Sequence, residues 1–560
     1  MTFLIRMASP LNKIHNYRPG VEDMKKSNLF ILISALLVLA LASGCAQSSN
    51  PKGAAGNNTA TKAENSTGAD SAAGKTITIA YSQGAGQTMD PHEAADLTSA
   101  SYAFALYDTL VTSATEEVDG KTVGRTDKVV PSLAESWKVS DDLTTYTFTL
   151  RDGAKFQSGN PVNADAVVYS FERVKTKGEG GSLYKLSNIQ SVTKIDDKTV
   201  EFKLGAPNHL FLKYLATFTF SIVDPSVAKD QPEDYLTQHS AGSGAFKLEK
   251  WDPATEAVFV ANKDYWNGAP KVDKVIVKYV AEASNREMFL EKGEVDVALD
   301  IPAKDVESLS KKDNITISSE SSNRIVYLGM NANFKPFDQL KVRQAINYVI
   351  DQNKLIQDVA FGQASPLKSS ISSKSPDFTA EGNEYEYNPE KAKALMKEAG
   401  YENGFTFDLT VNSSTQDYED IAVLLKAELE KIGVTLNINK VAPAQYRELI
   451  NNKKAAAFLG KYTSLVNDPS YHYGFLLDSK GASNYTGYNS KIVDDLLAQA
   501  NVEPDDAKRS ELYKQVQKQV TADSPWAYLY ESNLIVGISK GVNGYIFYPD
   551  EIIRFSSLYK

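Results

Sequence analysis

The sequence is poor in the residues that form disulfides and metal sites. Its 560 residues include one cysteine, Cys45, and five histidines. No cysteine follows Cys45, so disulfides, thiol catalysis and cysteine-ligated metals are excluded from the rest of the chain. The histidines at His92, His209, His239 and His472 show no close metal-ligand spacing. We therefore expect no metal and no cofactor.

Basic residues are outnumbered by acidic ones, which gives a formal net charge of −10 at pH 7. An acidic protein repels phosphate backbones, so nucleic acid is not an expected partner. The glycines of Gly242-Ser-Gly244 are not followed by the Lys-Ser/Thr of a phosphate loop. No Ser-His-Asp or nucleophile-elbow pattern stands out either. These absences argue against an enzyme, and no catalytic residue is predicted.

Long hydrophobic runs are also scarce, and the one that stands out is Leu29 to Ala42. A membrane span needs about 20 apolar residues, whereas shorter runs are typical of signal-peptide cores. Lys25 and Lys26 precede the run and form a basic n-region, so residues 24–44 are interpreted as a signal peptide. A signal core normally lies near the N-terminus. We therefore expect Met24 to be the true start and residues 1–23 to be an over-extended reading frame.

The signal ends in Ala42-Ser43-Gly44-Cys45, which resembles the lipobox of bacterial lipoproteins. The resemblance implies that Cys45 is acylated and becomes the first residue of the mature chain. An ordinary signal peptide followed by a chance cysteine is the alternative. Residues 46–74 are almost wholly Ala, Ser, Asn, Gly, Thr and Lys, a composition that predicts a flexible linker.

From Lys75 onward the composition is that of a globular protein, too long for one hydrophobic core. Alternating apolar residues predict strands at 76–80, 145–150, 199–204, 272–279 and 406–411. Helical periods with capping residues lie between them, at 164–174, 340–350, 389–399 and 418–432. Alternation of strands and helices predicts the α/β class with two or three lobes.

The body contains several distinctive sequence blocks: Leu133-Ala-Glu-Ser-Trp137, the block 146–156, the block 159–173 that ends in Phe-Glu-Arg173, Met89-Asp-Pro91, and Val342 to Asp351. These blocks resemble those of the bacterial family 5 extracellular solute-binding proteins. They occur in the family's order along nearly the whole body. Members of this family are the dipeptide, oligopeptide and nickel-chelate receptors of ABC importers.

The resemblance implies a three-lobed bilobal receptor of the periplasmic-binding-protein type II-like, Venus-flytrap kind. Lobe I would comprise residues 76–112, 225–326 and 533–560, lobe II would be an insert at 113–224, and lobe III would comprise 327–532. The ligand would lie in the cleft between lobes I and III. Hinges are implied at 326–329 and 527–530. Closure works because a ligand that contacts both lobes binds the closed state better.

The implied cleft loop, Lys461 to Pro469, ends in Asp-Pro as the family loop does. Dipeptide receptors hold the ligand's α-ammonium with an aspartate three residues before that acid, where this chain has Leu465. The stretch that matches their carboxylate-binding arginine, 411–415, contains no arginine. The chain therefore departs from the dipeptide pattern. The implied ligand-binding residues are Tyr327, Tyr462, Thr463, Ser464, Leu465, Val466, Asn467, Asp468, Tyr528 and Tyr530.

This lining of tyrosines and small polar groups predicts an oligopeptide-like ligand, held through backbone hydrogen bonds and aromatic surfaces. An oligosaccharide or a nickel or other metal chelate is the alternative within the family. A secreted hydrolase needs two carboxyl groups in a cleft, and Asp468 stands alone in its loop. The expected partners are the solute, the transmembrane subunits of an ABC permease, and a membrane reached through the lipid anchor. We expect a monomer on the outer face of the cytoplasmic membrane, or in the periplasmic space if an outer membrane is present.

Overall fold

The computed structural model describes residues 75–560, except 82–85 and 416. The signal segment, Cys45 and the linker at 46–74 lie outside the described residues. The described residues belong to one compact unit. No helix within the described part of the chain is long and apolar enough to cross a membrane.

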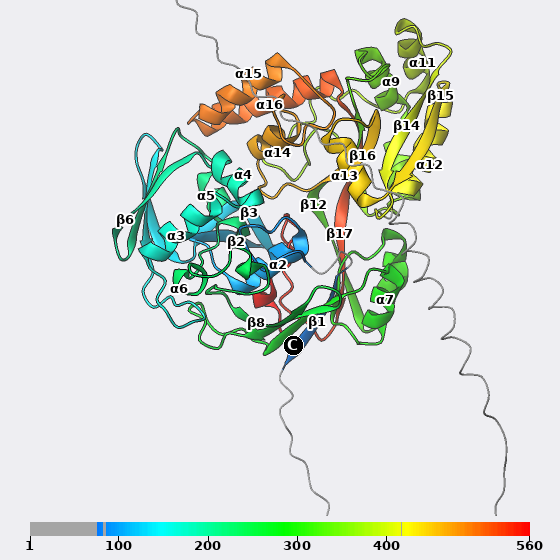
Figure 1. Cartoon of the computed structure of the whole chain (residues 1–560). Coiled ribbons are helices and arrows are strands. Elements are labelled where there is room, and N and C mark those ends of the chain that lie inside the picture. Colours follow the sequence, from blue (N-terminus) through cyan, green and yellow to red (C-terminus); the bar gives the residue numbers. More distant parts are fainter. Residues whose placement is uncertain (1–74, 82–85, 416) are drawn as a thin grey trace, which may run out of the picture. The chain divides into compact units, whose positions relative to one another are not determined.

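One mixed sheet of eleven strands runs through this unit. Its first half-sheet consists of β8 (Phe246–Asp252), β9 (Glu256–Ala261), β10 (Lys274–Tyr279), β1 (Thr76–Tyr81) and β11 (Val297–Ala298). Its second half-sheet consists of β16 (Ala457–Tyr462), β14 (Phe405–Asn412) and β15 (Val434–Val441). Two long crossing strands join the halves, β12 (Ile315–Met330) and β17 (Trp526–Ser539), and the short β13 (Ala364–Pro366) pairs with β17. Figure 1 shows the crossing strands between the two halves.

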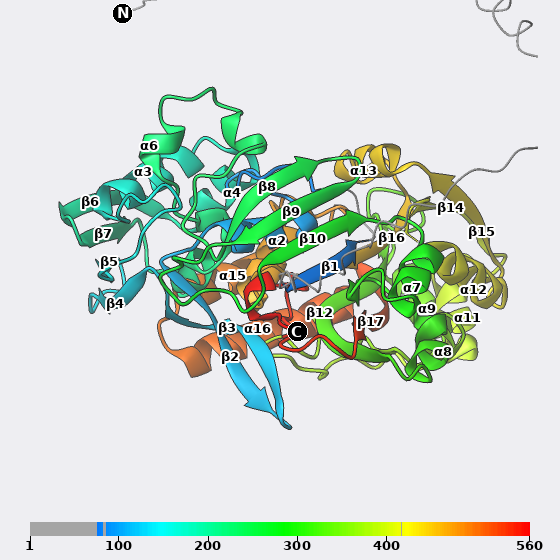
Figure 2. The same cartoon turned by 90° about the horizontal axis from the view of Figure 1, so that it is seen from below.

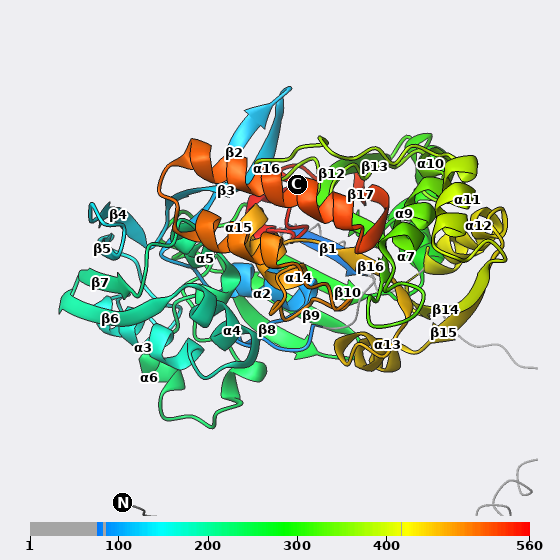
Figure 3. The same cartoon turned by 90° about the horizontal axis from the view of Figure 1, so that it is seen from above.

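Parallel pairing within each half-sheet depends on helical crossovers. β1 runs parallel to β10 and β11, and β14 runs parallel to β15 and β16. In Figure 3, α9, α11 and α12 lie beside β14 and β15. The larger helices of this side are α9 (Leu340–Val349), α10 (Gln352–Asp358), α11 (Pro389–Glu398), α12 (Tyr418–Glu430), α13 (Pro443–Asn451), α14 (Pro469–Leu476), α15 (Lys491–Val502) and α16 (Asp506–Asp523).

Helices α2 (Leu97–Leu106), α7 (Ala283–Glu291) and α8 (Val306–Ser310) belong to the side of the first half-sheet, whose strands β8, β9, β10 and β1 lie side by side in Figure 2. The described residues also form short 3₁₀ helices, namely η1 (Phe218–Phe220), η2 (Tyr235–Thr237), η3 (Ala303–Asp305) and η4 (Phe555–Ser557). Asp96 caps α2, because its side chain accepts a hydrogen bond from the backbone N–H of Ser99.

A separate group of elements lies between α2 and β8 in the sequence. It contains the hairpin of β2 (Val111–Val118) and β3 (Lys121–Pro131), and a four-stranded sheet of β4 (Ala134–Val139), β5 (Thr145–Leu150), β7 (Thr199–Leu204) and β6 (Ile189–Asp196). Its helices are α3 (Ala164–Val174), α4 (Gly178–Leu186), α5 (Phe211–Leu215) and α6 (Pro225–Ala228). Below, β2 to α5 are called the insert.

Each of the three regions has its own hydrophobic core. The insert packs Phe148, Phe171 and Phe202 edge to face, with Phe171 4.8 Å and Phe148 5.4 Å from Phe202 between ring centroids. Separate clusters of buried residues fill the side of the second half-sheet and the side of the first. The α/β class predicted from the sequence is confirmed. The lobe boundaries and the hinge positions stay predictions.

Candidate ligand-binding site

The crossing strands lose their regular pairing where they pass between the half-sheets. β12 pairs with β17 up to Ser321 and again from Ile325, so three residues of β12, 322–324, lie opposite one residue of β17. A bulge of this kind bends the strand and changes where its side chains point. Arg324, the last of the three, lines the cavity that adjoins the bulge.

This cavity has a volume of about 940 Å³. Its walls come from both halves of the sheet, through residues 300–304 on the first side, 460–463 on the second and 532–535 on crossing strand β17. Ligand pockets commonly measure about 300–1,000 Å³, so this one is large enough for a solute of several residues. Phe361 also lines the cavity and exposes 51% of its surface, which leaves an aromatic ring available to a ligand.

A glycine shapes the wall on the second side. Gly460 of β16 pairs with Tyr327 of β12, and a Cβ on Gly460 would lie 2.4 Å from Cζ of the Tyr327 ring. Without a side chain at 460 the ring can lie across β16, where it stacks on Trp526 with centroids 4.1 Å apart. The tyrosine is thus fixed in the cavity wall by packing.

A half-buried ion pair lies in the same wall. Lys461 Nζ lies 3.0 Å from both carboxylate oxygens of Asp417, and the Tyr530 hydroxyl donates to Asp417 Oδ2 at 3.0 Å. Burial by itself would raise the pKa of Asp417, but the Lys461 ammonium and these hydrogen bonds lower it below its usual value. The negative charge of Asp417 is therefore already paired with Lys461 within the protein.

Four of the ten residues predicted from the sequence line this cavity, namely Tyr327, Tyr462, Thr463 and Tyr530. They come from β12, from the end of β16 and from β17, which the sheet places next to one another. The six that do not line it are Ser464, Leu465, Val466, Asn467, Asp468 and Tyr528. Ligand contact by all ten stays a prediction.

The loop at 464–468 packs against the insert. Leu465 and Val466 contact the insert's apolar core. Asp468 Oδ2 accepts a hydrogen bond from Lys213 Nζ of α5 at 2.8 Å, and Asp468 Oδ1 caps α14. Burial would raise the pKa of Asp468, but Lys213 and His209 lower it well below its usual range. Asp468 thus joins the loop to the insert.

The other three residues have internal partners. The hydroxyl oxygen of Ser464 lies 3.2 Å from Nδ1 of His472. The side-chain amide of Asn467 donates a hydrogen bond to the backbone carbonyl oxygen of Lys374 at 3.0 Å. Tyr528 lies on β17 and packs in a buried cluster with residues of β12 and α16. All three side chains therefore contact other parts of the protein in this structure.

Several charged residues of the site were missed by the sequence analysis. Asp300, Arg324, Asp417, Arg447 and Glu551 all line the cavity. None lies in a recognisable motif, and Arg324 and Glu551 are 227 positions apart although they form an ion pair. The available signal was local: Arg324 directly precedes the apolar end of a strand, Ile325 to Met330.

The described residues hold no group of three or more His, Cys, Asp or Glu side chains that could bind a metal. His92 and His472 are both buried and use their ring nitrogens in hydrogen bonds to protein groups. Burial lowers the pKa of each to about 4, so both are neutral at pH 7. Neutral, internally bonded histidines are structural here.

Comparison with known proteins agrees with this architecture. Residues 128–484 match the model of the bacterial extracellular solute-binding proteins, family 5. The chain belongs to this family. A curated relative, the probable D,D-dipeptide-binding periplasmic protein DdpA of Escherichia coli, is 30% identical over 484 residues, which cover 85% of this chain and 92% of that protein.

Two solved structures are similar to this chain over most of its length. DppA of Helicobacter pylori, in complex with the peptide STSA, has a TM-score of 0.77 and 27% identity, and covers 86% of this chain and 98% of its own. The oligopeptide-binding protein AppA of Bacillus subtilis, in complex with a nonapeptide, has a TM-score of 0.74 and 26% identity with the same coverage. The predicted solute-receptor fold and family are therefore confirmed.

Proposed function

We propose that the protein is the receptor of an ABC importer, that it binds an oligopeptide-like solute in the cavity at the crossing strands, and that it performs no chemistry on the solute. The observation that carries the proposal is the cavity itself, whose walls come from two half-sheets joined through the crossing strands. A ligand there contacts both sides, so it stabilises the arrangement in which they approach each other.

The cavity suits a peptide in its size and its lining. Tyrosines from β12, β16 and β17 give apolar faces with polar tips, and the main-chain groups of 460–463 adjoin them. The two solved relatives are in complex with peptides of four and nine residues. An oligosaccharide or a metal chelate would use the same tyrosines. Comparing the three kinds of ligand by X-ray scattering distinguishes these alternatives from a peptide.

The proposal includes the location and the partners. The signal segment at 24–44 would direct export, and acylation of Cys45 would hold the mature chain on the outer face of the cytoplasmic membrane. The linker at 46–74 would let a monomeric body carry its solute to the transmembrane subunits of the permease. An envelope with an outer membrane would place the same body in the periplasmic space.

Peptide binding should make the protein more compact without changing its secondary structure. We expect a mixed tetrapeptide library to reduce the radius of gyration measured by small-angle X-ray scattering, while helix content measured by circular dichroism stays constant. Rigid-body movement about the two crossing strands is the physical reason. Maltooligosaccharides and nickel chelates, tested in parallel, should leave the scattering unchanged. Scattering curves that superimpose with and without saturating peptides, or compaction by a sugar or chelate alone, would contradict the proposal.

A further inference from the structure

The insert is fixed firmly to the first side. Its Gln157 side chain donates hydrogen bonds to the backbone carbonyl oxygens of Leu106, which ends α2, and of Phe246, which begins β8, at 3.1 and 2.6 Å. The ion pair of Arg173 with Asp90 adds a second, buried connection. The chain also enters the insert from α2 and leaves it toward β8. We therefore expect the insert to move together with the first half-sheet.

The insert reaches the second side through α5. Lys213 Nζ of this helix lies 2.8 Å from Oδ2 of Asp468, and His209 Nε2, just before the helix, lies 3.5 Å from Oδ1 of the same carboxylate. The ring of Tyr214 packs against that of Tyr471, with centroids 6.2 Å apart. Asp468 ends the loop 464–468 and Tyr471 lies on α14, so both belong to the second side.

Apolar packing encloses the same loop. Leu465 and Val466 contact the core of the insert, and Leu465 also contacts a smaller cluster that contains alanines of α2. Val466 is 2% exposed, and Tyr471 and Phe475 of α14 pack against the core of the insert as well. A loop enclosed between the insert and α2 cannot leave without exposing apolar surface to water, which is unfavourable.

The ion pair at this contact is largely shielded from solvent. The Asp468 side chain is 7% exposed and that of Lys213 is 20% exposed. Such a pair is screened by salt much less than a surface pair, and removing one partner leaves the other charge uncompensated. Asp468 also caps α14, so the pair joins α5 to the first turn of that helix. The bond between Lys213 and Asp468 therefore exists only while the insert and the loop are in contact.

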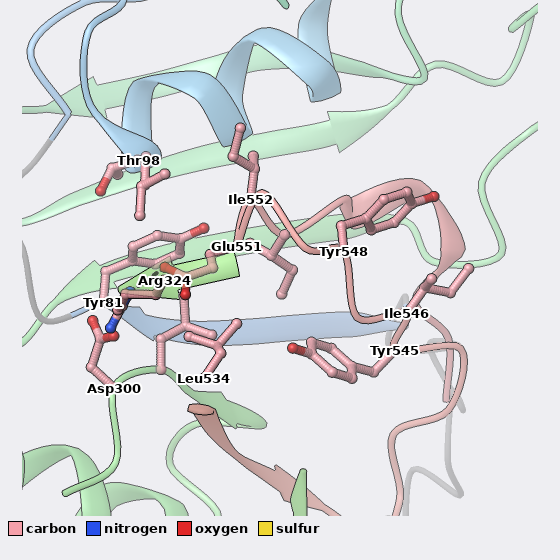
Figure 4. A pocket seen from close by; sticks show the side chains of 13 residues that line it. Tyr81, Thr98, Asp300, Arg324, Leu534, Tyr545, Ile546, Tyr548, Glu551 and Ile552 are labelled. Atoms are coloured by element: carbon pink, nitrogen blue, oxygen red, sulfur yellow. Dashed lines mark hydrogen bonds and ion pairs between the residues drawn. The ribbon is translucent and has the colours of Figure 1, made fainter. Parts of the chain in front are cut away.

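The loop continues the wall of the ligand cavity. Thr463, which lines the cavity, directly precedes the loop, and its hydroxyl donates to Oε2 of Glu551 at 3.3 Å. Figure 4 shows Glu551 and its ion-pair partner Arg324 in the wall of a small adjoining cavity. Asn323 of the bulge donates to the carbonyl oxygen of Ser464 at 3.1 Å. The loop is thus held near the crossing strands at one end and by α5 at the other.

We propose that α5 of the insert and the loop 464–468 form a latch, in which Lys213 holds Asp468 while the two sides are together and releases it when they separate. None of the described residues that line the cavity belongs to the insert, so the latch acts on the cavity from outside. A ligand shifts the population toward the closed state through contacts in the cavity. The latch adds to that stabilisation without touching the ligand. The proposal rests on the receptor function and gives the insert a part in it.

Lys213→Met tests the latch in the ligand-free protein, because methionine removes the ammonium but keeps an unbranched side chain. We expect amide hydrogen exchange, measured by mass spectrometry, to become roughly tenfold faster in residues 464–475 as well as in α5. A role confined to the insert would change exchange in α5 alone. Exchange in α12, on the second half-sheet, should stay as in the parent, which shows that the variant is folded.

The same variant should need more peptide for compaction. In the scattering experiment with the mixed tetrapeptide library, we expect half-maximal compaction of Lys213→Met to need roughly tenfold more peptide than that of the parent, because its closed state is less populated. Lys213→Arg keeps a cation that pairs with carboxylates and should behave as the parent does. A library that fails to compact the parent would contradict the receptor function, while the exchange experiment would still test the latch.

Lys194→Met is the matched control, because Lys194 pairs with Asp165 at 2.7 Å and both residues lie within the insert. It should leave exchange in residues 464–475 unchanged. Asp468→Asn removes the charge of the other partner, and asparagine caps helices as well as aspartate does, so it should accelerate exchange in α5 even if Lys213→Met folds poorly. Unchanged exchange across the contact in these two latch variants, or an equal increase in Lys194→Met, would overturn the latch.

Discussion

Replacing Cys45 by serine is expected to move the protein from the membrane fraction to the soluble fraction. Lipoprotein acylation attaches the lipid through the cysteine sulfur, and serine offers no thiol for this bond. Each buried methylene of an acyl chain contributes about 0.8 kcal/mol to membrane attachment, so the loss of two or three chains removes the anchor. Cell fractionation with immunoblotting measures the shift, and labelling with radioactive palmitate tests the acylation itself.

Ser48→Ala is the matched control, because it changes a hydroxyl three residues from Cys45 without touching the sulfur. It should stay in the membrane fraction and take up the label. Circular dichroism of the released Cys45→Ser protein should match that of the parent. Equal membrane retention of the serine variant and the parent would refute the lipobox interpretation and leave an ordinary signal peptide as the better one.

Local signals predicted the regular elements well. The helix predicted at 164–174 is found at Ala164–Val174, because the Asn163 side chain caps it by accepting from the Ala166 N–H at 3.0 Å. The helix predicted at 389–399 is found at Pro389–Glu398, between a capping Asn388 and Gly400 in a left-handed conformation. Both helices are specified by residues within one turn of their ends.

Apolar alternation did not predict the crossing strands, although the family resemblance implied hinges on them at 326–329 and 527–530, and the reason is physical. β12 is 16 residues long, but polar residues such as Ser321 and Asn323 interrupt its alternation where the bulge lies. Pairing with β17, more than 200 positions away, stabilises this segment as a strand. The same bulge brings Arg324 to Glu551, so the part of the site that lacks a local pattern is also the part built by tertiary contacts.

Family resemblance located the tyrosines of the site but not its charges. Tyr327, Tyr462 and Tyr530 lie on β12, β16 and β17 and line the cavity. Asp417 and Glu551 come from loops, which generally vary more in sequence than the elements they connect. The resemblance therefore identified the tyrosines of the cavity wall more readily than these two charged residues.

A buried ion pair connects two of the blocks that were recognised separately in the sequence. Asp90, from the block 89–91, accepts two hydrogen bonds from the guanidinium of Arg173, which ends the block 159–173; the bond between Oδ1 and Nη1 measures 2.8 Å. Their side chains are 1% and 11% exposed. His92 completes the group: Nδ1 lies 2.8 Å from Arg173 Nη1, and Nε2 lies 3.0 Å from the Ser221 carbonyl oxygen. Only the neutral imidazole, with its proton on Nε2, satisfies both neighbours.

Acid should destabilise the protein through this group. Burial lowers the pKa of His92 to about 4, so between about pH 6.5 and 4 the unfolded chain binds a proton that the folded chain does not. Stability contributed by neutral His92 is therefore present above that window and is lost as the pH falls through it. Burial would raise the pKa of Asp90, but Arg173 lowers it, so the stability from its ionised form is lost only at still lower pH, below about 4.

Asp90→Asn is expected to lower the free energy of unfolding at pH 7 by about 3–5 kcal/mol. The substitution keeps the shape of the side chain, but it leaves the charge of Arg173 buried without its partner. Urea denaturation followed by circular dichroism measures the loss. The difference in unfolding free energy between variant and parent should narrow as the pH falls below about 4, because Asp90 in the unfolded parent chain then takes up a proton while Arg173 keeps the pKa of the folded Asp90 lower. The double variant with Arg173→Met should recover part of the loss, since it removes the unpaired charge.

Asp495→Asn is the control. Asp495 pairs with Lys491 at 2.7 Å but is 55% exposed, so we expect its free energy of unfolding to change by less than about 1 kcal/mol. A similarly small change for Asp90→Asn would show that the pair contributes no more than a surface ion pair and that the two blocks are held together by apolar packing alone.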